Sequence, residues 1–226
     1  MNQAYFLTGT DTEIGKTFIT CALLHRATQL GLKAAGVKPI AAGTDALGDN
    51  EDVENILAAS NVTLAREITN SYCFKAAVAP HIAAAEEGIS IDFATIRAAC
   101  NSAIEQADLV IIEGVGGFCV PLGVDRNSAD LAVALGLPVI LVIGLRLGCI
   151  NHALLTAEAI KARGLPIAGW VANQIDPVMP RFEENLATLK ALLPAPLLGV
   201  VPYNAAGGSA AAASLLQLPG TPHLTT

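Results

Sequence analysis

The sequence predicts a three-layer α/β fold, in which a mostly parallel β-sheet is flanked by helices on both faces. Two observations lead to this prediction. Short apolar runs rich in Val, Ile and Leu alternate with longer segments of helical periodicity along the whole chain. The apolar runs are continuous, which is typical of parallel strands that are buried on both faces. Because 226 residues suit one large domain, we expect a single α/β domain over residues 1–226.

The elements follow from these patterns in chain order. Residues 4–8 are expected to form a buried strand, and residues 15–30 a helix with apolar residues at nearly helical spacing. Further short apolar runs predict strands at 34–40, 108–113, 138–143, 167–172 and 198–201. Helices are expected at 52–59, 92–106, 129–135, 150–163 and 180–193. The low-complexity stretch 205–217 is expected to begin as a loop and to end as a short helix.

The charge balance excludes several classes of partner. The formal net charge is −7, and Lys and Arg never gather into a run. Broad binding to nucleic acid or to an anionic membrane is therefore not expected. The longest clean apolar run, LPVILVIGL, is too short to cross a bilayer, and the N-terminus does not resemble a signal peptide.

The cysteines indicate a reducing environment. There are five of them, at positions 21, 73, 100, 119 and 149, and no two are spaced as C-x-x-C. An odd, scattered set argues against a disulfide framework and against a zinc site. We therefore expect free thiols and a cytoplasmic protein.

The stretch GTDTEIGKT at residues 9–17 has the character of a phosphate-binding loop. It follows a predicted strand and opens a predicted helix, where backbone N–H groups favour an anion. Lys16 adds a positive charge, and the hydroxyl of Thr17 can bind Mg²⁺. The usual loop has four residues between its first glycine and the Gly-Lys pair, whereas Gly9 and Gly15 are separated by five. The context favours a nucleotide loop built slightly larger than usual, and the alternative is that Gly-Lys-Thr merely starts a surface helix.

Several polar residues are expected at the same edge of the sheet. Ligands of such folds bind beyond the carboxyl ends of the strands, and Lys38, Glu113 and Asn173 each come at or after the end of a predicted strand. Asp52 and Glu113 offer the hard oxygen ligands that Mg²⁺ prefers. Asp52 lies in an acidic stretch that would equally form a solvated turn or a helix cap, and Lys38 would equally be a surface lysine.

An alternative function is a partition-type switch ATPase or GTPase acting as a regulatory binding module. Asn173-Gln174-Ile175-Asp176 is similar to the base-recognition motif of GTPases, with Gln in place of Lys. Glu113-Gly114-Val115-Gly116 is similar to their Asp-x-x-Gly motif. Partition-type ATPases usually carry an extra lysine early in the loop, whereas Thr10–Ile14 contains two acids and no lysine. The loop composition therefore disfavours this alternative.

Seven motifs, spread in order over nearly the whole chain, resemble dethiobiotin synthetases. They are GTDTEIGKT at 9–17, Lys38-Pro39, Ala79-Pro80-His81, EGVGG at 113–117, LGCINHA at 147–153, AGWVAN at 168–173 and PAPLLG at 194–199. This family resemblance implies a P-loop NTPase-type fold and an enlarged nucleotide loop. It also implies an ATP-dependent ligase of biotin biosynthesis. The substrates would be 7,8-diaminononanoate, CO₂ and MgATP, and the products dethiobiotin, ADP and phosphate.

The resemblance also implies roles for individual residues. The expected catalytic residues are Lys16, Lys38 and Glu13, and the expected Mg²⁺ ligands are Thr17, Asp52 and Glu113. ATP is expected to contact Thr12, Glu13, Ile14, Gly15, Lys16, Thr17, Phe18, Glu113, Gly116, Asn173, Pro202, Tyr203 and Asn204. The diamine is expected to contact Thr12, Lys38, Ala42, Pro80, Val115, Gly116, Gly117, Gly148, Cys149, Ile150 and Asn151.

The last four of these residues belong to a predicted helix start with free backbone N–H groups at Gly148 and Cys149. The resemblance implies a homodimer in which this helix start reaches the active site of the other subunit and holds the substrate carboxylate. The chain departs from the family at Ala42, where relatives often carry serine, and in its alanine-rich tail. No nucleic-acid or membrane partner is expected.

Overall fold

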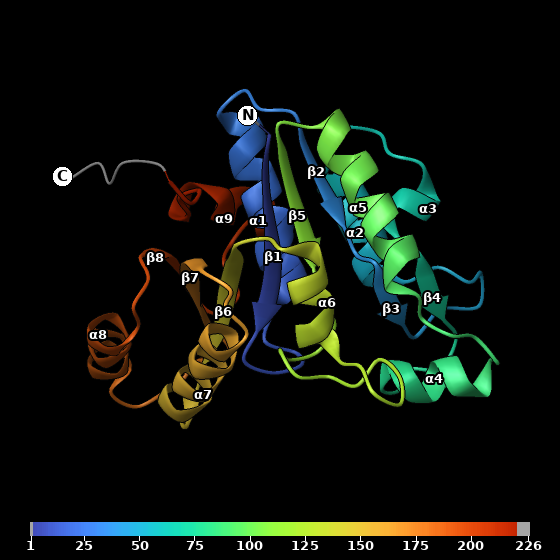
Figure 1. Cartoon of the computed structure of the whole chain (residues 1–226). Helices are drawn as coiled ribbons and strands as arrows, with labels where there is room; N and C mark the ends of the chain where they lie inside the picture. Colours follow the sequence, from blue (N-terminus) through green and yellow to red (C-terminus); the bar gives the residue numbers. More distant parts are fainter. Residues whose placement is uncertain (1, 221–226) are drawn as a thin grey trace.

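The computed structural model describes residues 2–220 and places a parallel six-stranded sheet at the centre of the molecule (Figure 1). The strand order is β2-β5-β1-β6-β7-β8, and each neighbouring pair runs parallel. The strands are β1 (Gln3–Gly9), β2 (Ala34–Val37), β5 (Leu109–Glu113), β6 (Val139–Leu145), β7 (Ile167–Gln174) and β8 (Leu197–Val201). The predicted three-layer α/β class is confirmed.

Successive side chains of the strands enter different halves of the core. Phe6 and Val110 belong to one buried cluster, whereas their neighbours Leu7 and Ile111 belong to the other. Side chains of a strand alternate between the two faces of a sheet, so each half of the core lies on one face. Burial on both faces explains the continuous apolar runs in the sequence.

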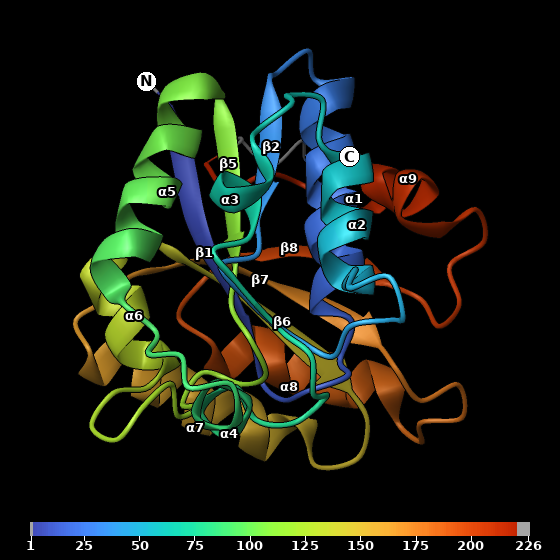
Figure 2. The ribbon, with the colours of Figure 1, turned by 90° about the vertical axis from the view of Figure 1, so that its right-hand side faces the viewer.

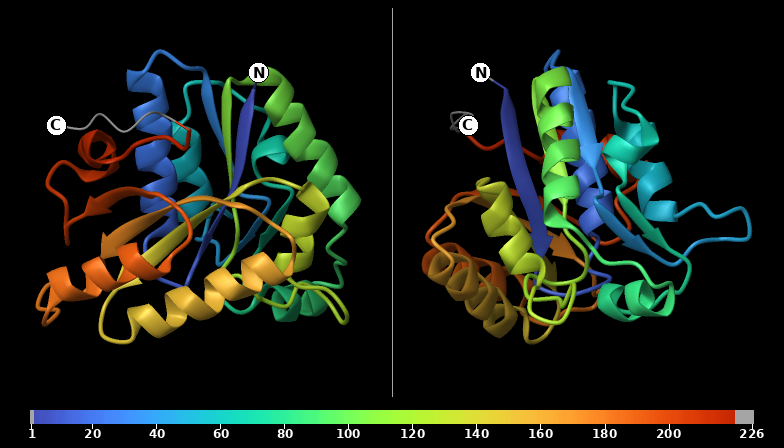
Figure 3. Two further views of the ribbon diagram at one scale, coloured as in Figure 1. Left: turned by 60° about the vertical axis from the view of Figure 1, so that its left-hand side comes forward. Right: turned by 45° about the vertical axis from the view of Figure 1, so that its right-hand side comes forward.

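Helices cover each face of the sheet (Figures 2 and 3). One face carries α1 (Lys16–Gln29), α2 (Glu51–Ala59) and α9 (Gly208–Ala212), which is followed by a 3₁₀ turn over Ala213–Leu215. The other face carries α5 (Phe93–Gln106), α6 (Ser128–Leu135), α7 (Cys149–Ala162) and α8 (Phe182–Leu192). Each of these helices except α9, for which no bounds were predicted, was predicted within two residues of its observed ends. As predicted, the stretch 205–217 begins as a loop and continues as a short helix.

The predicted strand 34–40 is wrong at its carboxyl end. β2 ends at Val37, and the chain then enters β3 (Ile40–Ala42), which pairs with β4 (Tyr72–Phe74) in a separate parallel sheet. The backbone N–H of Lys38 donates to Thr69 O at 2.7 Å instead of continuing the ladder with β5. Pro39 has no N–H to donate, and its carbonyl accepts from Tyr72 N. The chain therefore leaves the large sheet at Lys38.

Three short elements in and around this second sheet were not predicted from the sequence. They are α3 (Arg66–Thr69), β4 and α4 (Pro80–Glu86). A smaller correction concerns Asn173, which lies within β7 rather than after it. All five cysteines are free thiols, as predicted. None of the helices in residues 2–220 combines the length and the apolar character needed to cross a membrane.

Candidate active site

The stretch after β1 forms a tight loop that leads into α1. Gly15 adopts φ 82° at the start of the helix, and Glu13 adopts φ 57° although it has a side chain. Left-handed backbone is uncommon for a residue other than glycine and indicates that the surrounding structure imposes the conformation. Thr10 N donates to Val142 O of β6, which ties the beginning of the loop to the sheet.

Asn173 holds the far side of the loop. Its side-chain nitrogen donates to the Ile14 carbonyl at 2.8 Å, and the Ile14 side chain is buried in the core. A Cβ on Gly15 would lie 2.4 Å from this nitrogen, so a side chain at position 15 would displace Asn173. The strand β7 and the phosphate loop are therefore fitted to each other through Asn173 and Gly15.

Lys16 is buried at the start of α1, with 7% of its surface exposed. Its Nζ donates to the Asp11 carbonyl at 2.8 Å, so it bends back over the loop. Burial, and then the nearby charge of Lys38, lower the pKa of Lys16 to about 8. A buried cation that is held by a single neutral acceptor is suited to binding an anion.

Glu113 lies at the centre of a cluster of polar side chains at the end of β5. It has no exposed surface, and its register opposite Leu7 places it beside the loop. Its Oε1 accepts from Thr17 Oγ1 at 2.8 Å and from Lys38 Nζ at 2.5 Å. Its Oε2 accepts from Thr20 Oγ1 at 2.6 Å. A buried carboxylate is costly unless it is paired and hydrogen-bonded, and both conditions are met here.

Lys38 supplies the countercharge within this cluster. It is 4% exposed, and its Nζ also lies 3.0 Å from Asp52 Oδ2. Burial alone would lower the pKa of Lys38, but the carboxylates of Glu113 and Asp52 outweigh burial and raise it. Asn70 Nδ2 donates to the Lys38 carbonyl at 2.6 Å, which fixes the backbone where the chain leaves the sheet. Lys38 is therefore a buried ion-pair partner and not a surface lysine.

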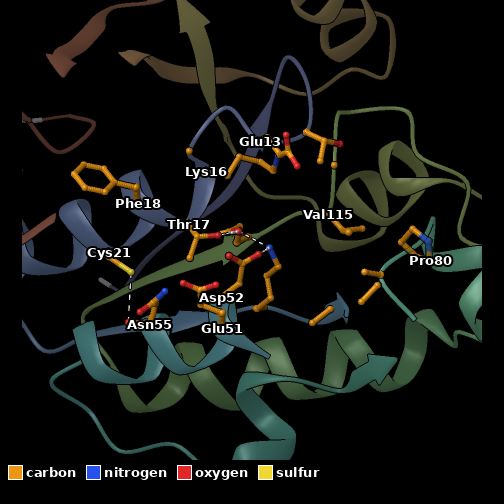
Figure 4. Close-up of a pocket in the computed structure, with 18 of the residues that line it drawn as sticks. Glu13, Lys16, Thr17, Phe18, Cys21, Glu51, Asp52, Asn55, Pro80 and Val115 are labelled. Carbon is orange, nitrogen blue, oxygen red and sulfur yellow. Dashed lines mark hydrogen bonds and ion pairs between the residues drawn. The ribbon is translucent and has the colours of Figure 1, made fainter. Parts of the chain in front are cut away.

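Asp52 reaches the cluster from α2 (Figure 4). The helix cap is Asn50, whose side chain accepts from Val53 N at 3.2 Å, so Asp52 is free to face the loop. Burial would raise the pKa of Asp52, but the ammonium of Lys38 overcomes it and holds the pKa below its usual value. Cys21 Sγ donates to the carbonyl of Asn55, which ties α2 to α1 next to Asp52.

The cluster suits a hard divalent cation. The carboxylates of Asp52 and Glu113 both accept from the Lys38 ammonium group, and the hydroxyl of Thr17 donates to Glu113. Within residues 2–220, no three or more His, Cys, Asp and Glu side chains gather into a metal cage. Mg²⁺ is usually held by one or two carboxylates and completes its octahedron with phosphates and water. The donor set therefore fits Mg²⁺ bound together with a nucleotide.

A large cleft opens next to the cluster, with a volume of about 1280 Å³. Its walls come from the phosphate loop, from α1 and α2, from the stretch before α4 and from the loop after β5. Of the residues expected at the site, the cleft is lined by Thr12, Glu13, Gly15, Lys16, Thr17, Phe18, Lys38, Ala42, Asp52, Pro80, Glu113, Val115 and Gly116. Figure 4 shows Glu13 and Lys16 from the loop on one side and Asp52 from α2 on the other.

The expected residues at the start of α7 do not line this cleft. Gly148 adopts φ 94° at the helix start, and Asn151 is exposed. The expectation of a free N–H at Cys149 is wrong, because Cys149 N donates to Arg146 O at 3.0 Å in a turn that precedes the helix. The side chain of Arg146 forms an ion pair with Asp11 at 2.5 Å, so this helix start lies beside the phosphate loop of the same chain.

The residues expected to contact the base come together at the ends of β7 and β8. Asn173 pairs in register with Val201, which directly precedes Pro202. Tyr203 N donates to Gln174 Oε1 at 3.4 Å, and Asn204 is left-handed with φ 46°. The end of β7, with Asn173 and Gln174, and the stretch Pro202–Asn204 thus lie together next to the phosphate loop.

Sequence analysis missed several residues of the site. The cleft is also lined by Cys21, His25, Ala41, Glu51, Asn55, Ala58, Ala59, Ala77, Val78, Ala79, Cys119, Val120, Pro121, Gly208 and Ser209. Thr20 was missed as well, although it follows Thr17 by three residues and therefore lies on the same face of α1. That spacing could have identified it. The contribution of α2 depends on how the helices pack, which local sequence patterns do not describe.

Comparison with known proteins places these features in context. A family model described as an AAA domain matches residues 3–210. The ATP-dependent dethiobiotin synthetase BioD of Aromatoleum aromaticum is 59% identical to the chain over 221 residues, which covers 96% of this chain and 98% of the relative. The motifs that carried the family resemblance lie within residues 3–210, which the family model matches.

Solved structures with a similar fold are more distant in sequence. The septum site-determining protein MinD of Pyrococcus horikoshii, complexed with Mg-ADP, has a TM-score of 0.54 and 18% identity over 90% of this chain and 82% of that chain. The cell division ATPase MinD of Pyrococcus furiosus has the same TM-score and identity over 90% of this chain and 84% of that chain. At these identities the likeness shows only the shared P-loop NTPase fold.

Proposed function

The chain belongs to the family of dethiobiotin synthetases, which are ATP-dependent ligases of biotin biosynthesis, and we propose that it closes the urea ring of dethiobiotin from 7,8-diaminononanoate, CO₂ and ATP. The single α/β domain would carry the whole reaction, as a homodimer in the cytoplasm without nucleic-acid or membrane partners. The interpretation as a regulatory switch ATPase loses its support, because the relative at 59% identity is a synthetase. The likeness to MinD concerns the fold alone.

The proposed reaction has three steps. One amine of the substrate adds to CO₂ and loses a proton, giving a carbamate. A carbamate oxygen then attacks the γ-phosphorus of ATP, and ADP leaves. The neighbouring amine attacks the carbonyl carbon of this carbamic-phosphoric anhydride, and phosphate leaves as the ring closes. Catalysis of such phosphoryl transfer is mostly positioning and charge stabilisation.

The buried ion pair of Lys38 with Glu113, next to the phosphate loop, is the observation that carries the proposal. Two ammonium groups, from Lys16 and Lys38, line one cleft at the carboxyl edge of the sheet. Both are almost fully buried, which strengthens their attraction for negative charge. We assign Lys16 to the phosphates of ATP and Lys38 to the carbamate and the γ-phosphate.

Thr17, Asp52 and Glu113 would hold Mg²⁺ at this point. The bound ion would neutralise charge on the β- and γ-phosphates and keep them in position. Since Lys38 contacts both carboxylates, the ammonium group and the metal would share the same two acidic side chains. Lys38 would therefore hold the carbamate close to the same two side chains that would hold the metal.

Asn173 would recognise the adenine through its oxygen. The side-chain nitrogen already donates to Ile14 O, which leaves Oδ1 as the atom for the base. An acceptor at this place suits the exocyclic amino group of adenine, which guanine replaces with a carbonyl. The backbone of Gly15 and of Glu113–Gly116, the side chain of Phe18 and the stretch Pro202–Asn204 would complete the nucleotide site.

The diamine would lie along the other wall of the cleft. Thr12, Ala42, Pro80 and the stretch Val115–Gly117 would contact its amines and its apolar chain. The substrate carboxylate would bind to Gly148–Asn151 of a second copy of the chain, because a helix start attracts anions. With Cys149 N–H occupied, the groups available to the carboxylate would be the N–H groups of the other residues in this stretch.

Glu13 would act on the amines. Its carboxylate lines the cleft from the left-handed turn of the loop and lies beside Lys16 in Figure 4. A carboxylate in this place would orient a protonated amine and accept the proton that the carbamate step releases. It would not contact phosphate, because like charges repel.

The decisive experiment is incubation of the purified protein with diaminononanoate, bicarbonate and MgATP, followed by mass detection of dethiobiotin. We expect dethiobiotin and ADP in equal amounts. ATP hydrolysis that requires a protein partner or a membrane, and proceeds without the diamine, would contradict the proposal.

A further inference from the structure

Thr20 carries a buried hydroxyl group to which the proposed reaction gives no role. The residue has no exposed surface, and it lies one turn beyond Thr17 on α1. Its Oγ1 donates to Glu113 Oε2 at 2.6 Å, whereas Thr17 and Lys38 both donate to Oε1. The two oxygens of Glu113 therefore have separate donors, with Thr17 and Lys38 on Oε1 and Thr20 on Oε2.

The direction of this hydrogen bond is informative. A threonine within a helix commonly donates to the carbonyl four residues earlier, and Thr28 does so in the same helix, to Leu24 O at 3.1 Å. Thr20 instead donates across the helix–sheet boundary to the last residue of β5. Charge-assisted hydrogen bonds of this length are stronger than neutral ones.

The hydroxyl fixes the rotation of the carboxylate. The terminal torsion of a glutamate is broad, so a carboxylate that is held at one oxygen can swing. With Thr20 on Oε2, the other oxygen must point toward Thr17 and Lys38. Without the hydroxyl, Oε2 would be buried without this donor, and Lys38 would be free to bridge both oxygens.

We propose that Thr20 is a positioning residue that presents Glu113 Oε1 to Thr17, to Lys38 and to the bound Mg²⁺. This inference rests on the proposed Mg²⁺ site. Partners that orient metal ligands typically change metal affinity or activity by about ten- to a hundredfold when they are removed. Thr20 does not touch the substrates, so its effect passes through Glu113.

The test compares Mg²⁺ dependence in three variants. Thr20→Val keeps the shape and removes the hydroxyl, Thr20→Ser keeps the hydroxyl, and Thr28→Val removes a hydroxyl elsewhere on α1. Calorimetry would measure ADP affinity over a series of Mg²⁺ concentrations, with thermal unfolding as a check of the fold. In Thr20→Val we expect the Mg²⁺ midpoint to rise by about tenfold or more, with ADP affinity in EDTA unchanged. The other two variants should match the wild type.

A double-mutant comparison separates positioning from a general packing role. In a Glu113→Gln background, Thr20→Val should no longer shift the Mg²⁺ midpoint, because the two changes act on the same contact. If Thr20→Val cannot be purified, Thr20→Ala tests the same hydroxyl against Thr20→Ser. A Thr20→Val or Thr20→Ala midpoint equal to that of the wild type would overturn the inference. If the wild type itself binds ADP without any response to Mg²⁺, the proposed metal site fails instead.

Discussion

The starts of α1 and α7 are built on the same backbone plan but differ in what surrounds them. Each follows a strand of the large sheet, and each begins with a left-handed glycine, Gly15 with φ 82° and Gly148 with φ 94°. At α1 the helix start is accompanied by Lys16 and a buried charge cluster from the same chain. At α7 the preceding Leu147 is 86% exposed.

This difference indicates which part of the proposed site one chain would complete alone. Buried charges are stable only when their partners are already in place, and the partners of Lys38 and Glu113 come from the same chain. An exposed leucine at a helix start requires no such partner and is available to a second molecule. We therefore expect changes near α1 to act within one subunit and changes at α7 to act between subunits.

The largest effect is expected from Lys38→Met. The change leaves Glu113 buried without its countercharge, which should cost about 3–5 kcal/mol of stability and remove activity. Urea unfolding would measure the loss, with the exposed Lys190→Met on α8 as the control. Adding Glu113→Gln should restore most of the stability, and a double variant as unstable as Lys38→Met would contradict this account.

Lys16→Met should separate activity from stability. Loss of a preorganised charge should reduce turnover by about a hundredfold or more. Because the folded pKa is about 8 against 10.5 for the free group, the protonated form is disfavoured in the folded protein. The variant should therefore be more stable than wild type below pH 8, and this gain should shrink as the pH rises from 8 toward 10.5.

Two measurements check Lys16→Met, namely turnover in the dethiobiotin assay and urea unfolding at neutral and alkaline pH. Near-wild-type turnover in a folded variant would refute the assignment of the loop to ATP. A stability difference that does not change with pH would show that the buried charge of Lys16 is not its cause.

Glu113→Gln should raise the Mg²⁺ concentration needed for activity, by about tenfold or more. The amide keeps the shape of the side chain but is a weaker ligand for a hard cation. Chelation with EDTA should abolish activity in the wild type. The exposed Glu158→Gln on α7 is the matched control, and an unchanged Mg²⁺ dependence in Glu113→Gln would remove that residue from the metal site.

Mixing two inactive variants tests the role of α7 between subunits. Asn151→Trp blocks the exposed helix start, and Lys16→Met disables the loop. If each site combines α1 of one subunit with α7 of the other, a heterodimer has one site with both defects and one intact site. Activity should therefore return after subunit exchange. Confirmed exchange without renewed activity would place the carboxylate site elsewhere.

Asp11→Asn should have the smallest effect. It removes the ion pair with Arg146 that joins the phosphate loop to the start of α7, and both side chains are nearly half exposed. Exposed pairs contribute less than about 1 kcal/mol and are screened by salt. Thermal unfolding at low and high salt would measure the change. A loss as large as that of Lys38→Met would mean that exposure does not decide the difference between the two regions.

The sequence predicted those parts of the fold and of the site that depend on local patterns. The strands of the large sheet and the helices on its faces follow from periodicity, and the loop from Gly9 to Thr17 follows from its residue types. The elements β3, β4 and α3 were missed because they have only three or four residues each. Strands this short have no recognisable period.

The charge cluster was predicted only in part. Lys38, Asp52 and Glu113 were each identified as candidates, but their sequence positions do not show that one ammonium joins two carboxylates. That contact depends on the packing of α2 against α1 and on the turn at Pro39. The free N–H expected at Cys149 was wrong for a similar reason, because the turn from Arg146 depends on backbone geometry rather than on residue type.

The ion pairs of Lys38 also lead to an expectation for how the protein behaves during purification. Since an internal ammonium group is already paired with Glu113 and Asp52, we expect the fold to hold together without a divalent ion. Zinc fingers behave in the opposite way, because they unfold when their metal is removed. A preparation dialysed against EDTA should therefore stay folded and recover full activity as soon as magnesium is returned.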